Sequence, residues 1–463
     1  MKTFALIEPV VALYCFASYL TFPLLQQYIY QRLWQDTTNT NFSGNLMPNE
    51  CETNISSPLY MDQKEVQQKA SMFSMMMDLS GLIPGLLVTL VIVAYGDRHG
   101  RKTSLWLPSL GGFVTSAFYF AISYFSWPLY ILYISAVLTG FLGRFGTFLG
   151  GCFAYAADIS HGSKQRTLRI ALIDMILGVS SGLAGIVSGY LIESVGFAWL
   201  FVTTCVLHFF NMVYIIFFLE ETVKISESQT NAFSAEGFKE IFAGVCLLFK
   251  NASCRKRSLI ISMLFAFMSY SFGQFGAFSI FTLYELGSPL CWDAVLIGWG
   301  SSLNTVVFVT SFLGVFLFTK CLKEPYIIFI GLFSWTSGML MSGFAKTTLL
   351  MFLVRVVIVF AFMPLPIFRS MMSKVVLDSE QGALFGCIAC LESLTATVSG
   401  VVFSCVYATT VMWLPGFSFL LAAGLVLIPM SLVWAIMLIG YEEEQPHTLF
   451  INEVESDGGD LLS

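Results

Sequence analysis

Apolar runs of about 20 residues alternate with shorter polar segments along most of this chain. A helix needs about 20 apolar residues to cross the hydrocarbon core of a bilayer, so each run predicts a membrane-spanning helix. Six runs precede the polar segment 220–257, at 4–28, 73–95, 104–125, 129–157, 168–192 and 197–219. Six more follow it, at 258–282, 296–319, 326–344, 349–371, 383–407 and 417–439. The pattern therefore predicts an all-α membrane protein with twelve transmembrane helices.

The polar segments divide the chain into two halves and a tail. Residues 1–219 form a six-helix N-terminal half that includes a hydrophilic loop at 29–70, and residues 258–440 form a six-helix C-terminal half. A central loop at 220–257 joins them. Two six-helix repeats around a midplane cavity are a transporter architecture. The acidic tail at 441–463 has too few apolar residues to fold, so we expect it to be disordered.

Composition excludes a soluble protein. Hydrophobic residues make up 56% of the chain and charged residues only 11%, which is far from the balance of soluble domains. The net charge of -6 says little about partners, since much of it comes from the tail, and we expect no nucleic-acid partner. No small-residue cleavage site follows a short apolar region near the start, so we expect the first span to be retained rather than removed as a signal peptide.

The distribution of Lys and Arg predicts the orientation in the membrane. If both termini are cytosolic, the loops and helix ends on that side hold 17 basic residues, and the opposite side holds Arg32, Lys64, Lys69 and Lys346. An excess of this kind marks the cytosolic side. Loop 29–70 then faces the secretory lumen, where we expect glycosylation of the sequon residues Asn41 and Asn54.

The same orientation sorts the eleven cysteines. Nine fall within spans or on the cytosolic side, where thiols stay reduced. Only Cys51 and Cys291 fall in lumenal loops, one in each half, and we predict a disulfide between them. Cys387 and Cys390 form a C-x-x-C inside an apolar helix with no second ligand pair, so we expect packing there and no metal site.

A charged turn separates the second and third spans. Asp97, Arg98 and Arg101 lie there with Gly96 and Gly100, which allow a sharp reversal. Asp97 and Arg101 have an i, i+4 spacing, so they can pair with each other or with a neighbouring helix end. The pattern G-D-R-x-G-R-K resembles the loop signature of the major facilitator superfamily. That resemblance implies that these charges latch the cytosolic side of a transporter and act in gating.

Longer segments narrow the resemblance. The chain resembles solute carrier family 46 of that superfamily from the first span to residue 441, on the segments 284–293, 297–300, Arg369 with 373–374, and 380–385. Segments 80–85, 310–314 and 413–417 are most similar to the lysosomal member of the family. The resemblance implies a transporter without cofactor, driven by the proton gradient. Its cargo would include steroid conjugates, bile acids and bulky catabolites.

Charged side chains inside the membrane are costly unless they are paired or face a cavity, so they are candidates for transport chemistry. Asp174, in the fifth span, matches the position of an acidic proton-coupling residue in the folate member of the family. A carboxyl there can be protonated from an acidic lumen. The alternative is an ion pair with Arg166 or Arg169. Asp78 and Glu392 are further candidates for a proton relay or an interhelical pair.

Arg144 is a candidate substrate contact. It lies deep in the fourth span between glycines that let a ligand approach. A cation at this point would favour an anionic group such as a sulfate or carboxylate. The resemblance places an acidic residue of the folate member at this position, so the resemblance does not imply folate specificity for this chain. The alternative is an internal ion pair with Asp78 or Glu392.

Three more residues are candidate substrate contacts. Arg369 matches a functionally important arginine of the folate member, although a simple cytosolic anchor is the alternative. Arg355, in the tenth span, is the remaining base without an obvious partner. Gln274 stands about where the folate member has a histidine, so proton coupling need not follow the folate route.

The tail carries a candidate sorting signal. Asp457-x-x-x-Leu461-Leu462 resembles an acidic dileucine signal for endosomes and lysosomes, although a chance Leu pair is the alternative. Its place at the end of a cytosolic tail makes it accessible to clathrin adaptors.

These observations predict a lysosomal, multi-pass proton-coupled symporter that exports organic anions and amphiphilic small molecules to the cytosol. A plasma-membrane importer of folates or other organic anions is the alternative. A receptor with an inactive transporter fold would need no intramembrane charges. An enzyme is not expected, because neither His208 nor the Ser and Thr residues show the spacing of a nucleophile and a base. The expected partners are the substrate, protons, membrane lipid and adaptors.

Overall fold

The computed structural model describes residues 7–38, 58–160, 162–222, 254–286, 290, 292, 294–377, 380–410 and 414–439. These residues form fifteen α-helices. In chain order they are α1 (Ile7–Thr38), α2 (Pro58–His99), α3 (Thr103–Tyr124), α4 (Ile131–Phe141), α5 (Phe145–Asp158), α6 (Ser163–Val195), α7 (Phe197–Phe217), α9 (Cys254–Leu286), α10 (Ala294–Phe318), α11 (Glu324–Gly343), α12 (Thr348–Val357), α13 (Pro364–Val375), α14 (Gln381–Thr410), α15 (Phe417–Leu425) and α16 (Leu427–Ile439). The all-helical prediction is confirmed.

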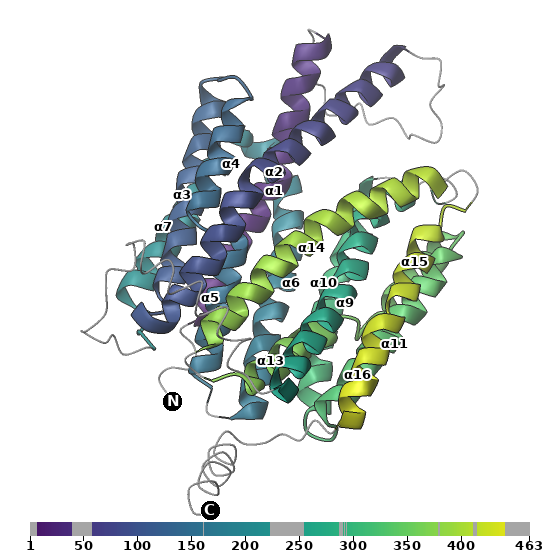
Figure 1. Cartoon of the computed structure of the whole chain (residues 1–463). Coiled ribbons are helices and arrows are strands. Elements are labelled where there is room, and N and C mark those ends of the chain that lie inside the picture. Colours follow the sequence, from purple (N-terminus) through teal and green to yellow (C-terminus); the bar gives the residue numbers. More distant parts are fainter. Residues whose placement is uncertain are drawn as a thin grey trace, which may run out of the picture.

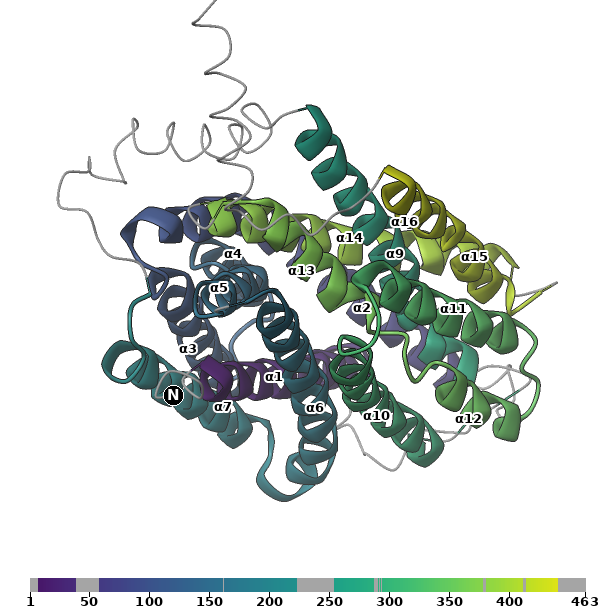
Figure 2. The same cartoon turned by 90° about the horizontal axis from the view of Figure 1, so that it is seen from below.

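The helices form two halves that lie side by side. Figure 1 shows α1–α7, from purple to teal, beside α9–α16, from teal-green to yellow. We call the side where α1 begins and α16 ends the terminal side, and the opposite side the distal side. The halves meet along two seams, where α2 packs on α14 and α6 packs on α10. Figure 2 shows α14 along one edge of the contact between the halves, with α6 and α10 along the opposite edge.

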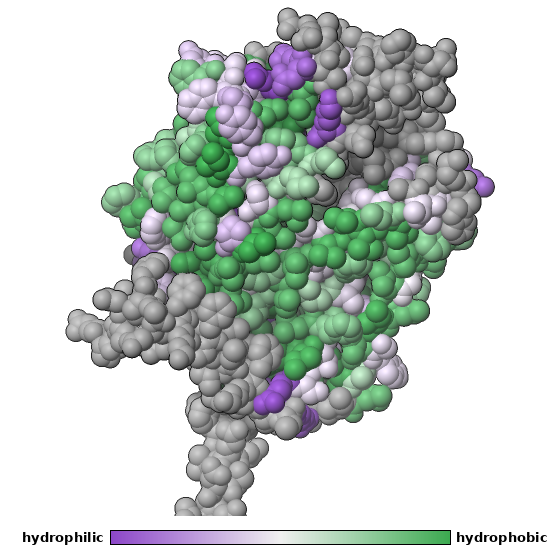
Figure 3. Space-filling view, turned by 45° about the horizontal axis from the view of Figure 1, so that its top comes forward, coloured by the Kyte–Doolittle hydropathy of each residue, from purple (hydrophilic) through white to green (hydrophobic). Residues whose placement is uncertain are grey.

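The twelve predicted spans agree with the helices of the described residues. Ten stretches are long and apolar enough to cross a membrane, and the shorter apolar helices Thr305–Phe318 and Thr348–Val357 lie in the eighth and tenth predicted spans. Apolar side chains cover a broad belt of the surface (Figure 3). Several of them are more than 60% exposed, among them Ile83, Phe217, Phe333, Leu349 and Leu438. Such a surface is suited to lipid rather than to water.

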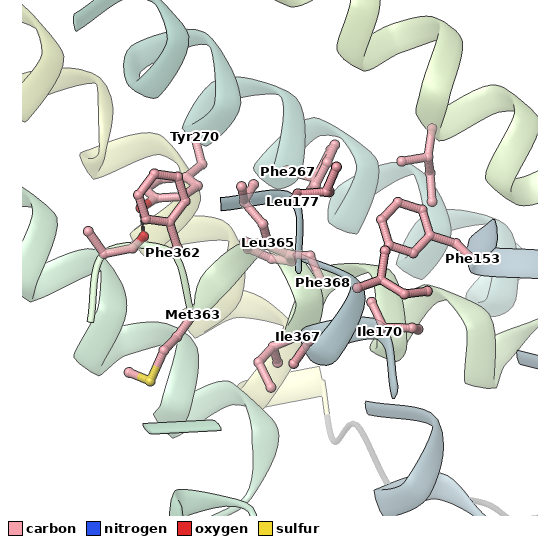
Figure 4. Close-up of a cluster of buried hydrophobic side chains, with 14 of the residues drawn as sticks. Phe153, Ile170, Leu177, Phe267, Tyr270, Phe362, Met363, Leu365, Ile367 and Phe368 are labelled. Carbon is pink, nitrogen blue, oxygen red and sulfur yellow. Dashed lines mark hydrogen bonds between the residues drawn. The ribbon is translucent and has the colours of Figure 1, made fainter. Parts of the chain in front are cut away.

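A buried apolar cluster joins the two halves near the middle of the molecule. In Figure 4, Phe153, Ile170 and Leu177 of the N-terminal half lie beside residues of the C-terminal half. The labelled residues from that half are Phe267, Tyr270, Phe362, Met363, Leu365, Ile367 and Phe368. Close packing of these side chains fixes the helices that carry the charged residues described below.

Two spans at corresponding places in the two halves are broken. The fourth span is interrupted between α4 and α5, where Gly143 has φ +80°. The tenth is interrupted between α12 and α13, and Pro364 lies at the start of α13. Proline cannot donate a backbone hydrogen bond, so it fits the first turn of a helix and not its interior. Interrupted helices in corresponding positions are the best local indication of a transporter's binding site.

Side chains form hydrogen bonds with the backbone groups at the break in the tenth span. The Tyr270 hydroxyl donates to the Ala361 carbonyl, and the Ser311 hydroxyl donates to the Val359 carbonyl over 3.0 Å. The Phe362 amide in turn donates to the Ser311 hydroxyl over 3.2 Å. Backbone groups at membrane depth need such partners because no water is available there. The break in the tenth span is therefore stabilised by specific side chains of the C-terminal half.

The turn after the second span differs in one respect from the expectation. Gly100 reverses the chain with φ +110°, as predicted. Gly96 does not take part, because α2 continues through it to His99. The helix continues because no proline lies between Gly96 and Gly100 and Gly96 does not have positive φ. The reversal therefore needs only one glycine.

Candidate functional site

A cavity of about 680 Å³ lies between the two halves. Its size is within the range of pockets that bind small molecules. The N-terminal half contributes Tyr19, Asp78, Leu79, Leu82, Gly85, Leu86, Thr89, Arg144, Phe145, Gly146, Leu149, Phe153, Asp174, Leu177, Gly178 and Ser181. The C-terminal half contributes Phe275, Phe308, Phe362, Leu365, Arg369, Ile388, Ala389, Glu392, Ser393, Ala396, Thr397, Gly400 and Val401. The cavity is therefore mostly apolar, with a few charged side chains.

Three of the charged residues form one cluster, which we call the Arg369 cluster. Arg369 donates from Nη1 to both carboxylate oxygens of Asp174, at 2.8 and 2.7 Å. It donates from Nη2 to both oxygens of Glu392, at 2.8 and 2.9 Å. Asp174 lies on α6, Arg369 on α13 and Glu392 on α14, so the cluster joins the two halves. One guanidinium is thus held between two carboxylates.

The surroundings of the cluster are apolar. The side chain of Arg369 is 2% exposed, and those of Asp174 and Glu392 are 14% and 16% exposed. The guanidinium carbon lies 4.5 Å from the ring centroid of Phe153 and 5.4 Å from that of Phe267. Aromatic faces attract a cation. A net charge in such a site is poorly screened, so its protonation and its ligands are coupled.

The other two charged residues of the lining form a pair at the broken fourth span. Arg144 Nη2 donates to Asp78 Oδ1 over 3.3 Å, and Nη1 donates to the Asp78 carbonyl over 3.1 Å. The pair is more open than the Arg369 cluster, since the two side chains are 34% and 51% exposed. Arg144 immediately precedes α5, whose first residues include Gly146 of the cavity wall. A helix start and a partly free guanidinium together favour an anion.

Hydroxyl groups also lie near the Arg144–Asp78 pair. Thr89 of α2 bonds Thr147 of α5 at 2.7 Å between the hydroxyl oxygens. Gly146 lies so close to α14 that a Cβ there would be 3.0 Å from the Ser393 hydroxyl. Glycine at 146 therefore lets the start of α5 approach α14.

The structure brings together five of the seven residues that we predicted for proton coupling and substrate binding. Asp78, Arg144, Asp174, Arg369 and Glu392 line one cavity. For Arg144 the ion pair with Asp78, stated above as an alternative, is present.

The alternative partners of Asp174 are not the ones observed. Arg369 holds the carboxylate, while Arg166 donates to the Ser373 carbonyl over 3.0 Å. Arg169 lies five positions before Asp174 on α6 and does not form an ion pair with it. Arg369 is also no simple cytosolic anchor, because its guanidinium is buried between two carboxylates.

Arg355 and Gln274 do not line the cavity. The expectation that Arg355 is unpaired was wrong, because its Nη2 lies 2.7 Å from Glu285 Oε1 and both side chains are buried. The two groups belong to α12 and the end of α9, far apart in sequence. Gln274 is fully buried on the face of α9 that also carries Tyr270, and no described residue bonds its amide. We therefore do not assign either residue to substrate.

Sequence reasoning missed Glu285 as the partner of Arg355. The signal was an acidic residue at the end of the seventh apolar run, one of the few acids near a span.

Sequence reasoning also missed the side chains that join the two halves on the terminal side. Thr167 of α6 donates to Glu324 Oε1 of α11 over 2.9 Å and bonds Ser370 of α13 at 2.5 Å. Hydroxyl residues are too common in spans for their sequence to single these out.

Arg101 of the predicted latch binds Asp158 of the N-terminal half and Glu221 at the start of the central loop. Its Nε lies 2.8 Å from Asp158 Oδ2, and its backbone amide donates to Glu221 Oε1 over 2.6 Å. The side chain is 1% exposed. The side chains of Asp97 and Arg98 lie outside the described residues, so the expected Asp97–Arg101 pair stays a prediction.

Several other predicted sites lie outside the described residues. These are the sequon residues Asn41 and Asn54, the cysteines Cys51 and Cys291, and the sorting residues Asp457, Leu461 and Leu462. They stay predictions. Within the described ranges, no group of His, Cys, Asp and Glu is arranged to hold a metal ion.

Comparison with known proteins identifies the fold and the superfamily. The family model of the Major Facilitator Superfamily matches residues 9–397. The human organic anion transporter MFSD10 (TETRAN) has a similar structure, with a TM-score of 0.71 and 16% identity over 93% of this chain and 99% of that chain. The E. coli fucose:proton symporter FucP has a TM-score of 0.65 and 12% identity over 94% and 98%. Identities this low show the shared fold alone.

Curated sequences are much closer. The chicken protein named lysosomal proton-coupled steroid conjugate and bile acid symporter SLC46A3 is 52% identical over 98% of this chain and 99% of its own. The human protein of that name is 44% identical over 98% and 99%. The rat proton-coupled folate transporter is 32% identical over 96% and 93%. The chain therefore belongs to solute carrier family 46 of the major facilitator superfamily, a family of transporters and not of enzymes.

Proposed function

We propose that this protein is a proton-coupled symporter of the lysosomal membrane that exports organic anions, steroid conjugates and bile acids among them, from the lumen to the cytosol. The Arg369 cluster is the observation that carries the proposal, because it places two carboxylates and one guanidinium in a cavity lined by both halves. The names of relatives that are 44–52% identical support the lysosomal membrane and the substrate class.

The charge of the Arg369 cluster explains how a proton and an anion are coupled. With both carboxylates ionised, the cluster carries one net negative charge and repels an anion. Protonation of Asp174 or Glu392 makes the cluster neutral and removes that repulsion. Because the site is largely buried, the effect of one charge is strong there. Anion binding and protonation therefore favour each other.

Arg144 supplies the attraction for the anion. Its side chain is about a third exposed, whereas that of Arg369 is buried between its two partners. An anionic group that reaches Arg144 competes with Asp78, whose contact is long at 3.3 Å. A guanidinium offers several donors to one sulfate or carboxylate. The anion site and the proton site are thus separate groups in one cavity.

We place the terminal side in the cytosol, following the distribution of basic residues. The distal side then faces an acidic lumen. Each pH unit across the membrane supplies about 1.4 kcal/mol per proton. No cofactor is needed in this cycle. The folate-type alternative is less supported, because the folate transporters are only 31–32% identical to this chain.

Uptake by proteoliposomes with a pH step tests the coupling. With a steroid sulfate as substrate, uptake by the native protein should rise when the side that corresponds to the lumen is acidified. Asp174→Asn and Glu392→Gln each remove the excess negative charge, so each variant should lose most of its dependence on acid. Asp36→Asn makes the same chemical change at an exposed position at the end of α1 and is the matched control.

Two outcomes would contradict the coupling. One is uptake by the native protein that does not respond to the pH step. The other is an unchanged pH profile in both cluster variants at normal protein levels, which would make the cluster a structural ion pair. Arg369→Gln leaves two buried carboxylates without a cation and should abolish uptake.

The position in the cell and the orientation have their own tests. Leu461→Ala with Leu462→Ala should move the protein from lysosomes to the cell surface, where surface biotinylation detects it.

Asn41→Gln with Asn54→Gln should remove the mobility shift caused by glycosidase treatment if loop 29–70 is lumenal. A free thiol at Cys51 in the non-reduced protein would contradict the predicted disulfide with Cys291.

A further inference from the structure

The two ends of the cavity differ in chemistry. At the seam between α2 and α14 the lining carries Asp78, Thr89, Arg144, Ser393 and Thr397. We call this the polar end. Beside α6 and α10 the lining carries Leu177, Gly178, Phe308 and Phe362, with Asp174 of the Arg369 cluster one turn away on α6. We call this the aromatic end.

The aromatic end is a rigid wall. Phe308 of α10 stacks on Phe362 of the broken tenth span, with ring centroids 3.8 Å apart and planes at 24°. Phe362 also stacks against Phe278, with centroids 5.7 Å apart, and Phe278 contacts Trp335 at 5.7 Å. Rings that are supported from behind in this way keep their orientation. A flat apolar body can pack on such a surface without rearranging it.

Glycine at 178 allows Phe308 to take its place in this wall. A Cβ at position 178 would lie 2.0 Å from Cγ of Phe308. Any side chain there would push the ring out of its stack with Phe362. Gly178 belongs to α6 and Phe308 to α10, so the wall is completed only where the two halves meet.

The Arg369 cluster lies between the two ends. Asp174 precedes Gly178 by one turn of α6, so it is next to the aromatic end. Glu392 directly precedes Ser393 on α14, so it is next to the polar end. A ligand that touches both ends must therefore pass over the proton site.

We propose that the substrate lies across the cavity from seam to seam, with its anionic group at Arg144 and a rigid polycyclic body against the Phe308–Phe362 wall. This inference rests on the proposed function and adds the orientation of the substrate and the residues that select its shape. Phe308 and Phe362 select for a fused-ring body, and Gly178 is a positioning residue that acts through Phe308. A small anion with a single ring occupies the polar end alone.

A comparison of two sulfates of different size tests this orientation. A four-ring steroid sulfate and a one-ring aryl sulfate are offered to the same proteoliposomes. Phe308→Ala should raise KM for the steroid sulfate about tenfold, because roughly one ring face of apolar contact is lost. KM for the aryl sulfate should stay within about twofold of the native value on the same reasoning. Phe333→Ala, at a residue 68% exposed on the apolar surface, is the matched control and should change neither KM.

The second arm examines the polar end and the positioning residue. Arg144→Gln should raise KM for both sulfates by the same factor, because both place the sulfate there. Gly178→Ala should reproduce the selective loss of Phe308→Ala, and Phe308→Leu should recover part of the affinity for the steroid sulfate. Measurement of the amount of folded protein in each vesicle preparation separates these effects from poor insertion.

The outcomes distinguish this inference from the proposed function. Equal losses for both sulfates in Phe308→Ala, or no loss for either, would overturn the orientation while acid-driven uptake by the native protein continues. Failure of acid to drive uptake of any organic anion by the native protein would instead overturn the proposed function.

Discussion

Two buried arginines of this protein differ in the number of carboxylates that they hold. Arg355 holds one, Glu285, and the pair is neutral and lies outside the cavity. Arg369 holds two, Asp174 and Glu392, and lies in the cavity wall. A neutral pair has little to gain from binding a proton, whereas a cluster with one carboxylate in excess can become neutral by doing so. Charge balance therefore marks the Arg369 cluster as the site where protonation removes a net charge.

Glu285→Gln should destabilise the protein without changing its transport chemistry. It would leave the Arg355 guanidinium buried without an anion, which costs about 3–5 kcal/mol. We expect a lower midpoint of thermal unfolding in detergent, while the protein that remains folded keeps the native pH profile of uptake. Glu285→Gln combined with Arg355→Met should recover much of the lost stability. A flattened pH profile in the single variant would mean that this pair also takes part in coupling.

At the residue scale, the sequence predicts which charges matter but not all of their partners. Charged residues inside apolar runs stand out, so Asp174, Arg369 and Glu392 could be named. Their pairing could not, because Asp174 and Arg369 are 195 positions apart and no local spacing relates them. Arg355 was misread for the same reason, since its partner lies 70 positions earlier.

At the scale of elements, the lengths of the apolar runs predict the spans well but hide their interruptions. The fourth span is broken before α5 and the tenth before α13. Weak local signals existed, in the glycines around Arg144 and in Pro364 and Pro366. Hydropathy alone cannot detect such breaks, because a broken helix is as apolar as a continuous one. The break in the fourth span is what directs Arg144 into the cavity.

Gly143→Ala should therefore weaken substrate binding through Arg144. Gly143 has φ +80°, and a Cβ there would lie 2.9 Å from the hydroxyl oxygen of Thr147. A non-glycine residue in this conformation costs about 1–3 kcal/mol. The turn should rearrange and move Arg144, raising KM for organic anions several-fold with a smaller change in kcat.

Kinetics of acid-driven uptake measure this effect. Gly424→Ala is the matched control, because nothing lies within 4 Å of a Cβ at that position of α15. An unchanged KM in Gly143→Ala would show that the conformation of this turn does not position the substrate.

At the scale of the whole molecule, a group of hydrogen bonds joins the halves on the terminal side. Arg166 Nη1 donates to the Ser373 carbonyl over 3.0 Å, and Thr167 bonds both Ser370 and Glu324. We call these five residues the terminal-side clasp. Arg101, the residue that the loop signature points to, instead binds Asp158 of α5 and Glu221 at the start of the central loop. Exchange of a substrate with the terminal side requires that the clasp opens.

Thr167→Val should shift the protein toward the state that is open on the terminal side. The change keeps the shape of the side chain but removes hydrogen bonds to Ser370 and Glu324, and each such bond contributes about 0.5–1.5 kcal/mol. The equilibrium between the two states should move by up to about tenfold per bond. Spin labels on α6 and α13 should report longer distances at this side, and KM for substrate offered from the distal side should rise because fewer molecules expose the site there. Thr203→Val is the matched control, since its hydroxyl only donates to the Trp199 carbonyl of its own helix. Unchanged distances and an unchanged KM in Thr167→Val would show that other contacts keep this side closed.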